Sequence, residues 1–538
     1  MHLNFSFLRM LAVVGCVLML VACSGVAVED SKVNDPSAGG SNNNSSNSSS
    51  SGNANSGGNN NSGSNSSSNS SSGNSGGSGE NGGSSSSSSS SSGTATGSNQ
   101  PYFYFSYDDS ASTASRDLSH FYIKNDFRPL PNWGRSYEFL NAEAFEHFMP
   151  ETYGDFSISA GLHQADLAEI PVRERVDSDE SVYHLGVNIT GPRLEKEDRP
   201  NIVLTLLVDI SGSMGRFYAD RTPTDVRSLM DVVKHGLGLL EGSLKSGDVI
   251  NLVTFETTAN VILENLQFDP GDTSELNMVI ENLSTQGSTA LNDGIEAAYL
   301  VARRTYDADK SNRIVMLTDA EPNTGEVDPK IISDNLVING LEGIHFSGVG
   351  IGSEFNDKFL NELTDIGKGG YFAMVTPGDS ERIFGKGFVR FIDDAVSDIQ
   401  FKLTYPESFR YLAASSSAEQ VSQEPDEVQT TNFAFNSEQF FLEKFAAKDL
   451  IEGEKFILEI EFDGVDERQV LKIEKTVDEL IGNGRDQIIA ASSVGMLADL
   501  IGWRINCNKV RSTSFLDLDS ESTVYIDYKA LITQFCSY

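Results

Sequence analysis

Five polar side chains have the types and positions that a divalent cation requires. They are Asp209, Ser211, Ser213, Thr289 and Asp319. The first three share one turn after an apolar segment, residues 202–208, and the last follows a second apolar segment, residues 313–318. Mg²⁺ prefers oxygen ligands in octahedral geometry and takes few carboxylates from a protein, so hydroxyls, waters and an incoming ligand complete its shell. These residue types therefore indicate a cation site.

Part of this pattern is also compatible with a helix N-cap or with a catalytic pair of carboxylates. Asp and Ser accept hydrogen bonds from free N–H groups at the start of a helix, so the turn at residues 209–213 alone also fits a helix N-cap. Two carboxylates also serve in acid–base catalysis, but that chemistry requires shifted pKa values and a substrate cleft, and it gives the hydroxyls no role. Thr289 and Asp319, which follow in order along the chain, favour the cation site.

The same residues resemble the motif of a known family. An Asp-x-Ser-x-Ser turn followed by a distant Thr and a distant Asp is the metal-ion-dependent adhesion site of von Willebrand factor type A domains, and every position is filled here. The resemblance implies that the two serines and Thr289 bind the metal directly, and that Asp209 and Asp319 bind it directly or through waters. It implies Mg²⁺, or else Mn²⁺ or Ca²⁺, and a protein ligand whose Asp or Glu carboxylate completes the shell. The expected chemistry is adhesion without turnover.

Residues 201–392 are expected to form the α/β domain that carries this site. Apolar runs typical of strands alternate there with helical patterns. The runs are residues 202–208, 249–255, 313–318, 344–349 and 371–375. The first helical pattern spans residues 225–240, and a later one spans residues 295–305. This alternation predicts a doubly wound, mostly parallel sheet with helices on both faces, whose ligands bind beyond the carboxyl ends of the strands.

One stretch departs from the family pattern next to the site. The segment 216–224 is longer than the usual connection between the Asp-x-Ser-x-Ser turn and the first helix. It contains two aromatic residues and two arginines. We therefore expect Phe217, Tyr218 and Arg221 to overhang the metal and to contact the ligand.

The flanking segments, residues 101–200 and 393–538, have the pattern of β-rich domains. Apolar residues alternate there with polar or small ones. The alternating residues are Tyr183, Leu185, Val187 and Ile189, then Ile399, Phe401, Leu403 and Tyr405, then Phe456, Leu458, Ile460 and Phe462. This period predicts half-buried, mostly antiparallel strands. Neither flank has a complete strand set, so our hypothesis is one β-sandwich into which the α/β domain is inserted. A late helix is expected at residues 486–501.

The start of the chain has the features of a bacterial lipoprotein signal. Arg9 precedes an apolar run, residues 10–22, that is too short to span a bilayer, so residues 1–22 are expected to be removed as a signal peptide. The run ends in Leu-Val-Ala-Cys, which resembles the lipobox, where cleavage leaves Cys23 as an acylated N-terminus. An ordinary secretory signal with an incidental Cys is the alternative. Ser24 in place of Asp indicates outer-membrane sorting in a Gram-negative host.

Residues 23–100 are expected to form a disordered tether between the lipid and the folded domains. From residue 37 to residue 98 the sequence is almost entirely Ser, Asn and Gly, with a run of serines at residues 84–92. A Gly/Ser-rich coil of this length has a root-mean-square span of roughly 40–45 Å. A glycosylated or adhesive stalk is the functional alternative to a solvated spacer.

The charge balance limits the classes of partner. The formal net charge is −38, with 77 acidic and 39 basic residues. A surface of this kind repels nucleic acid and anionic lipid head groups. We therefore expect no nucleic-acid partner, and membrane contact only through the lipid anchor.

Cys507 and Cys536 are the cysteines that remain once Cys16 leaves with the signal and Cys23 is acylated. Disulfides persist in the oxidising compartments that a signal peptide implies. If paired, the two thiols close a loop worth about 3–4 kcal/mol in the chain-entropy model. Two buried free thiols are the alternative.

Together these features predict a membrane-tethered lipoprotein of the bacterial cell envelope, at the outer membrane, that binds a protein ligand through the cation site. The alternative is a metal-dependent scaffold or adaptor for the assembly of an envelope protein complex. An enzyme is not expected, because its catalytic residues would have to lie in the flanks, where no recognisable motif occurs.

Overall fold

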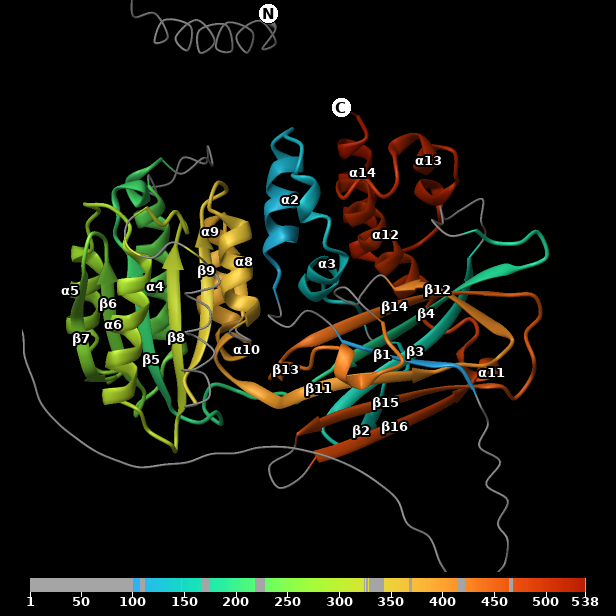
Figure 1. Cartoon of the computed structure of the whole chain (residues 1–538), viewed down its shortest axis with the longest axis horizontal. Helices are drawn as coiled ribbons and strands as arrows, with labels where there is room; N and C mark the ends of the chain where they lie inside the picture. Colours follow the sequence, from blue (N-terminus) through green and yellow to red (C-terminus); the bar gives the residue numbers. More distant parts are fainter. Residues whose placement is uncertain are drawn as a thin grey trace, which may run out of the picture. The chain divides into compact units, whose positions relative to one another are not determined.

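The chain is organised around a mixed sheet, a β-sandwich and a layer of helices (Figure 1). This computed structural model describes residues 100–537, except residues 107–111, 147, 166–174, 218–227, 324, 326–327, 329–342, 367–369, 415–420 and 464–467. The signal segment, Cys23 and the tether therefore lie outside the described residues, as do Tyr218 and Arg221. Within the part that is described, no helix has both the length and the apolar character needed to cross a membrane.

The central α/β domain is a mixed sheet with the strand order β10-β9-β8-β5-β6-β7. All neighbouring pairs are parallel except β6 with β7. The strands are β5 (Ile202–Asp209), β6 (Val249–Phe255), β7 (Ala259–Gln267), β8 (Ser311–Thr318), β9 (His345–Ile351) and β10 (Tyr371–Met374). The sheet has a hydrophobic core on each face. Successive side chains of β5 alternate between these cores, with Leu206 in one and Leu207 in the other. The predicted fold class is confirmed.

Helices cover both faces of this sheet. They are α4 (Leu229–Ser243), α5 (Ser274–Asn282), α6 (Leu291–Arg304), α8 (Asp357–Ile366), α9 (Pro377–Ser380) and α10 (Phe388–Ile392), with the π-helical turn η3 (Glu381–Lys386) before α10. The helix α4 begins later than the pattern predicted, because Ser228 caps it. The Ser228 Oγ accepts the Asp231 N–H at 3.2 Å, and the Asp231 carboxylate accepts the Ser228 N–H at 2.8 Å.

The edge strand β7 and the helix α5 were not predicted from the sequence. In β7 the consecutive residues Asn260, Val261 and Ile262 are all exposed, so the strand lacks the alternation that marks a half-buried strand.

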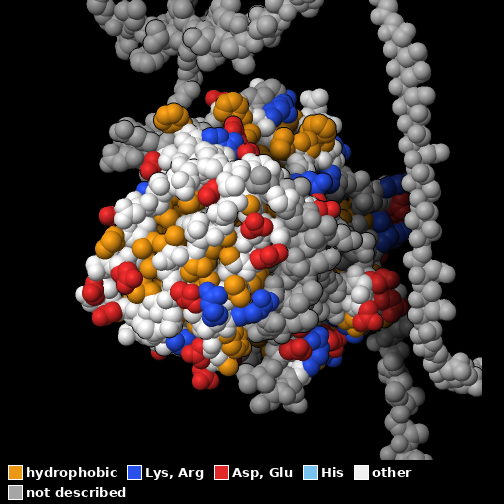
Figure 2. Space-filling view, turned by 60° about the vertical axis from the view of Figure 1, so that its left-hand side comes forward, with side chains coloured by type: hydrophobic (Ala, Val, Ile, Leu, Met, Phe, Trp, Pro, Cys, Tyr) orange, Lys and Arg blue, Asp and Glu red, His pale blue; other side chains and the backbone are white. Residues whose placement is uncertain are grey.

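On the face shown in Figure 2, hydrophobic side chains gather near the centre, with acidic and basic side chains interspersed around them. The acidic excess of the sequence is thus mixed with basic residues on this face.

The β-sandwich contains strands from both flanks in each of its sheets. One sheet has the order β1-β11-β15-β16, with β13 also paired to β11, and the other has the order β12-β14-β4-β3-β2. The strands are β1 (Tyr102–Phe105), β2 (Glu151–Tyr153), β3 (Phe156–Ala165), β4 (Ser181–Thr190), β11 (Asp394–Thr404), β12 (Phe409–Ala414), β13 (Thr431–Ala434), β14 (Glu438–Ala447), β15 (Lys455–Asp463) and β16 (Arg468–Thr476). Their inward side chains form one core. Both flanks therefore contribute strands to one sandwich, and the central domain is inserted between β4 and β11.

A layer of helices, also drawn from both flanks, lies against the sandwich and the central domain. This helical layer consists of α2 (Ala114–Lys124), α3 (Ser136–Ala142), α12 (Arg485–Ile501) and α14 (Thr523–Phe535). Only α12 was expected from the sequence. Its side chains are buried on nearly all sides, in one hydrophobic core with residues of β14 and of the central domain. A disulfide joins Cys507, at the start of α13 (Cys507–Arg511), to Cys536 after α14, with a Cα–Cα distance of 5.5 Å.

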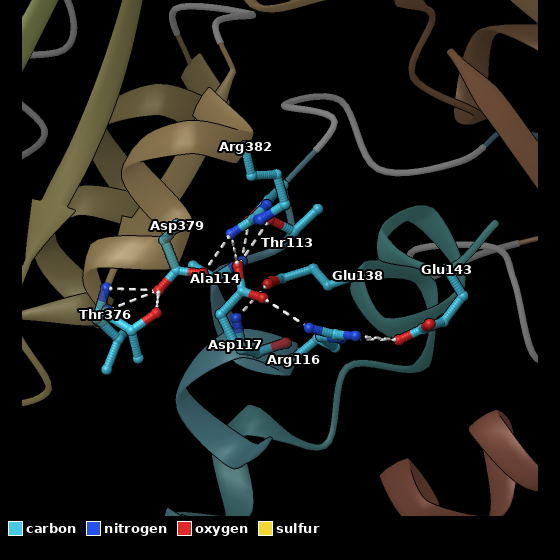
Figure 3. A network of polar contacts seen from close by, with 12 residues as sticks. Thr113, Ala114, Arg116, Asp117, Glu138, Glu143, Thr376, Asp379 and Arg382 are labelled. Carbon is cyan, nitrogen blue, oxygen red and sulfur yellow. Dashed lines mark hydrogen bonds and ion pairs between the residues drawn. The ribbon is translucent and has the colours of Figure 1, made fainter. Parts of the chain in front are cut away.

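Polar contacts to buried carboxylates tie the helical layer to the central domain (Figure 3). The Arg382 Nη2 lies 2.6 Å from the Asp117 Oδ2, and the same guanidinium contacts Asp379 at 3.3 Å. Farther along the interface, Asp357 at the start of α8 accepts hydrogen bonds from the Trp133 Nε1 at 3.1 Å and the Arg135 Nη2 at 3.0 Å. A buried carboxylate is tolerated only when its partners are all present. These contacts therefore fix the layer against this edge of the central sheet.

Candidate metal centre

Three segments of the central domain meet beyond the carboxyl ends of β5 and β8. The parallel register pairs Val208 with Leu317, so Asp209 and Thr318 lie side by side at the ends of their strands. The loop before α6, which carries Thr289, is bonded to the turn after β5, because the Gly212 N–H donates to the Gly287 carbonyl at 3.2 Å. It is also bonded to the loop after β8.

Asp209 is fully buried, and each of its carboxylate oxygens accepts one hydrogen bond. The Ser211 N–H donates to Oδ1 at 2.8 Å, and the Thr318 hydroxyl donates to Oδ2 at 2.6 Å. Thr318 in turn accepts the N–H of Ala320 at 2.9 Å, a residue with a φ of +52°. Asp209 is thus fixed in orientation, while each oxygen keeps an unused lone pair.

Asp319 is also fully buried, but its two oxygens differ. The Oδ2 accepts a hydrogen bond from the Arg216 Nη2 at 2.8 Å. The Oδ1 is buried, and among the described residues no group donates a hydrogen bond to it. A buried carboxylate oxygen without a partner is costly, and such groups usually mark a site that a water or an ion occupies. The Oδ1 of Asp319 is therefore a candidate ligand of a cation.

The three hydroxyl groups complete the set of candidate ligands. Ser211 and Thr289 are 1% and 0% exposed, and the Ser211 Oγ lies 2.9 Å from the Ser213 Oγ. Thr289 is held by Asn323, whose Oδ1 accepts the Thr289 N–H at 2.9 Å and whose Nδ2 donates to the Thr289 Oγ1 at 3.3 Å. The hydroxyls are therefore positioned by the same turns that bring the carboxylates together.

This set of donors fits a hard cation. Every candidate ligand atom is an oxygen, and two of the candidate ligands are carboxylates, which is within the one or two that Mg²⁺ usually takes from a protein. In the described part of the chain, no group of three or more His, Cys, Asp or Glu side chains could hold a metal. The candidate site is of another kind, because hydroxyls supply most of its ligands.

The predicted ligand contacts are placed only in part. Phe217 is 88% exposed and its backbone pairs with Ser228, whereas Tyr218 and Arg221 lie outside the described residues. Two residues of the site, Arg216 and Asn323, were not predicted from the sequence. They contact Asp319 and Thr289. The sequence indicates them only by their positions near predicted ligands. Arg216 is three residues after Ser213, and Asn323 is four residues after Asp319.

The pKa of Asp209 is raised from 3.8 to about 6, mainly by burial and also by the negative charge of Asp319, against the hydrogen bonds from Thr318 and Ser211. Because this pKa is above that of an unperturbed Asp, the folded chain binds the proton more tightly than the unfolded chain does. The corresponding stability is present below about pH 4 and is lost as the pH rises through 6. Without a cation, ionised Asp209 therefore destabilises the fold at neutral pH.

Comparison with known proteins identifies the central domain. Residues 204–321 match the family model of the von Willebrand factor type A domain, a range that contains every candidate ligand. The chain is 26% identical over 222 residues to the protein YfbK of Escherichia coli (strain K12). The aligned region covers 41% of this chain and 36% of that protein. It is 27% identical over 167 residues to inter-alpha-trypsin inhibitor heavy chain H3 of Mesocricetus auratus, covering 30% of this chain and 18% of that protein.

The chain thus spans well under half the length of either relative. Among solved structures, the von Willebrand factor type A protein from Catenulispora acidiphila aligns with a TM-score of 0.39 and 16% identity. That alignment covers 64% of this chain and 80% of the other.

An Asp209→Asn variant tests the raised pKa of Asp209 in the metal-free protein. In the presence of a chelator, we expect the variant to exceed the wild type in free energy of unfolding by about 3 kcal/mol at pH 7.5, because the uncharged amide removes the cost of ionisation. Near pH 4.5 the difference should fall to about 1 kcal/mol, since Asp209 is then protonated in the folded wild type but still largely ionised in the unfolded chain. Urea denaturation at the two pH values measures it. An equal difference at both would show that the pKa is not raised.

Proposed function

Because the central domain has the von Willebrand factor type A fold, we propose that the chain binds a protein ligand through a divalent cation. The cation is held by Asp209, Ser211, Ser213, Thr289 and Asp319. The observation that supports the proposal is the buried Oδ1 of Asp319, which accepts no hydrogen bond from any residue that the structure describes.

The charges of these ligands suit Mg²⁺, with Mn²⁺ or Ca²⁺ as alternatives. The hydroxyls of Ser211, Ser213 and Thr289 bind the cation directly, and the two aspartates bind it directly or through waters. A cation with two carboxylates is formally neutral, so a further carboxylate can approach without net repulsion. The ligand is therefore a protein that offers an Asp or Glu side chain, and its binding involves no turnover.

The sequence features outside the described residues support a place in the bacterial cell envelope. In this proposal the signal at residues 1–22 is removed and Cys23 carries acyl chains at the outer membrane. The segment 23–100 then separates the lipid from the binding domain. More than one acyl chain gives stable anchoring, whereas a single chain gives only marginal, reversible binding.

A pair of serine variants tests the cation site. We expect Ser213→Ala to weaken Mg²⁺ binding by roughly tenfold or more, because it removes a ligand. Ser228→Ala, in the same segment, removes only the N-cap of α4, so it should lower stability by about 1 kcal/mol and leave Mg²⁺ affinity unchanged. Calorimetric titration of the purified chain measures both. Equal affinities in the two variants, or no binding by the wild type, would refute the site.

A pair of cysteine variants tests the lipid anchor. Cys23→Ser should abolish incorporation of labelled fatty acid and release the protein from the membrane fraction, because no acyl acceptor remains. Cys16→Ser changes a residue inside the signal itself and should leave both unchanged. Membrane association that persists in Cys23→Ser would show that the chain is held by something other than a lipid on this residue.

A further inference from the structure

Arg216 holds a positive charge directly against one of the candidate metal ligands. Its Nη2 lies 2.8 Å from the Oδ2 of Asp319 and 3.3 Å from a carboxylate oxygen of Glu321. The side chain of Arg216 is 39% exposed, whereas that of Asp319 is fully buried. The positive charge of the Arg216 guanidinium therefore balances the negative charge of buried Asp319.

The position of Arg216 is set by the turn that carries the candidate serine ligands. Its backbone N–H and its Nε both donate to the Ser213 carbonyl, at 2.9 and 3.2 Å. Its own carbonyl accepts the N–H of Leu229, the first residue of α4, at 3.1 Å. These hydrogen bonds hold Arg216 in place, so its guanidinium has a fixed position in the site.

The charges around Arg216 determine how this side chain affects a bound metal. Asp209, Asp319 and Glu321 carry three negative charges and Arg216 carries one positive charge, so the site without a metal has a net charge of about −2 when all are ionised. A bound divalent cation shares Asp319 with Arg216, and the two positive charges repel each other across one carboxylate. Solvent screens this repulsion only in part, because Asp319 is buried.

We propose that Arg216 is an internal competitor for the divalent cation, which pairs with Asp319 when the metal is absent and lowers the affinity of the site for the metal. The inference rests on the proposed function, since it assumes that the site takes a divalent cation. The competitor keeps buried Asp319 paired in the metal-free protein. When the charge of Glu321 is counted with those of the two aspartates, Arg216 also leaves the metal-loaded site neutral rather than negative, which favours a ligand that carries a carboxylate.

Calorimetric titration of Mg²⁺ into the full chain tests the competition. Arg216→Gln should bind Mg²⁺ roughly tenfold more tightly than the wild type, because the opposing charge is gone. Arg216→Lys keeps the charge and should stay near the wild type. Arg304→Gln is the matched control, since Arg304 forms a similarly exposed ion pair with Glu264. It lies at the far end of α6 from Thr289, about 20 Å along the helix, and should not change the affinity.

Thermal unfolding in the presence of a chelator gives a second measurement. Arg216→Gln should lower the melting temperature without metal, because Asp319 loses its partner, and saturating Mg²⁺ should restore it. A lower melting temperature without tighter Mg²⁺ binding would overturn the competition and leave Arg216 a structural residue. Tighter binding by Arg304→Gln to the same extent would also overturn it, since net charge alone would then be the cause. If the wild type and all variants bind no Mg²⁺, the proposed function fails together with the inference.

Discussion

Parallel pairing of β5 with β8 is the constraint on which the site depends. Both strands are largely buried, and apolar residues lead up to their carboxyl ends, namely residues 206–208 of β5 and residues 314–317 of β8. At that end the register sets Asp209 beside Thr318, and the 2.6 Å hydrogen bond between them fixes the first carboxylate. Asp319 follows immediately. Two carboxylates are thus brought into a buried environment that no helix or loop could have created alone, and their burial creates the need for a positive charge.

The same end of the sheet is connected to the helical layer through two adjacent residues. The Asn356 N–H donates to the backbone carbonyl of Asp319 at 3.0 Å. The next residue, Asp357, accepts the hydroxyl of Tyr371 at 2.7 Å and the hydrogen bonds of Trp133 and Arg135 from the helical layer. The loop after β9 therefore holds the candidate site on one side and the helical layer on the other.

Local patterns were enough to predict the central domain but not its surroundings. Apolar runs and helical spacing gave the parallel strands, and the Asp-x-Ser-x-Ser turn with Thr289 and Asp319 gave the candidate ligands, because both are encoded over short stretches. The pairing of β1 with β11 and of β4 with β14 joins residues hundreds of positions apart, so period-two alternation suggested one sandwich but not its strand order. Arg216 could not be found in this way. Its role depends on the position of its guanidinium group, which is set by the geometry of the turn at Ser213.

The central claim is that a divalent cation lies between the ends of β5 and β8, and anomalous diffraction tests it most directly. Crystals of the chain would be soaked in Mn²⁺, and data would be collected at the manganese absorption edge, where only the metal gives a strong signal. We expect one dominant anomalous peak within bonding distance of the hydroxyls of Ser211, Ser213 and Thr289 and beside the Oδ1 of Asp319. A map without a peak at this position, with Mn²⁺ bound only elsewhere, would contradict the claim.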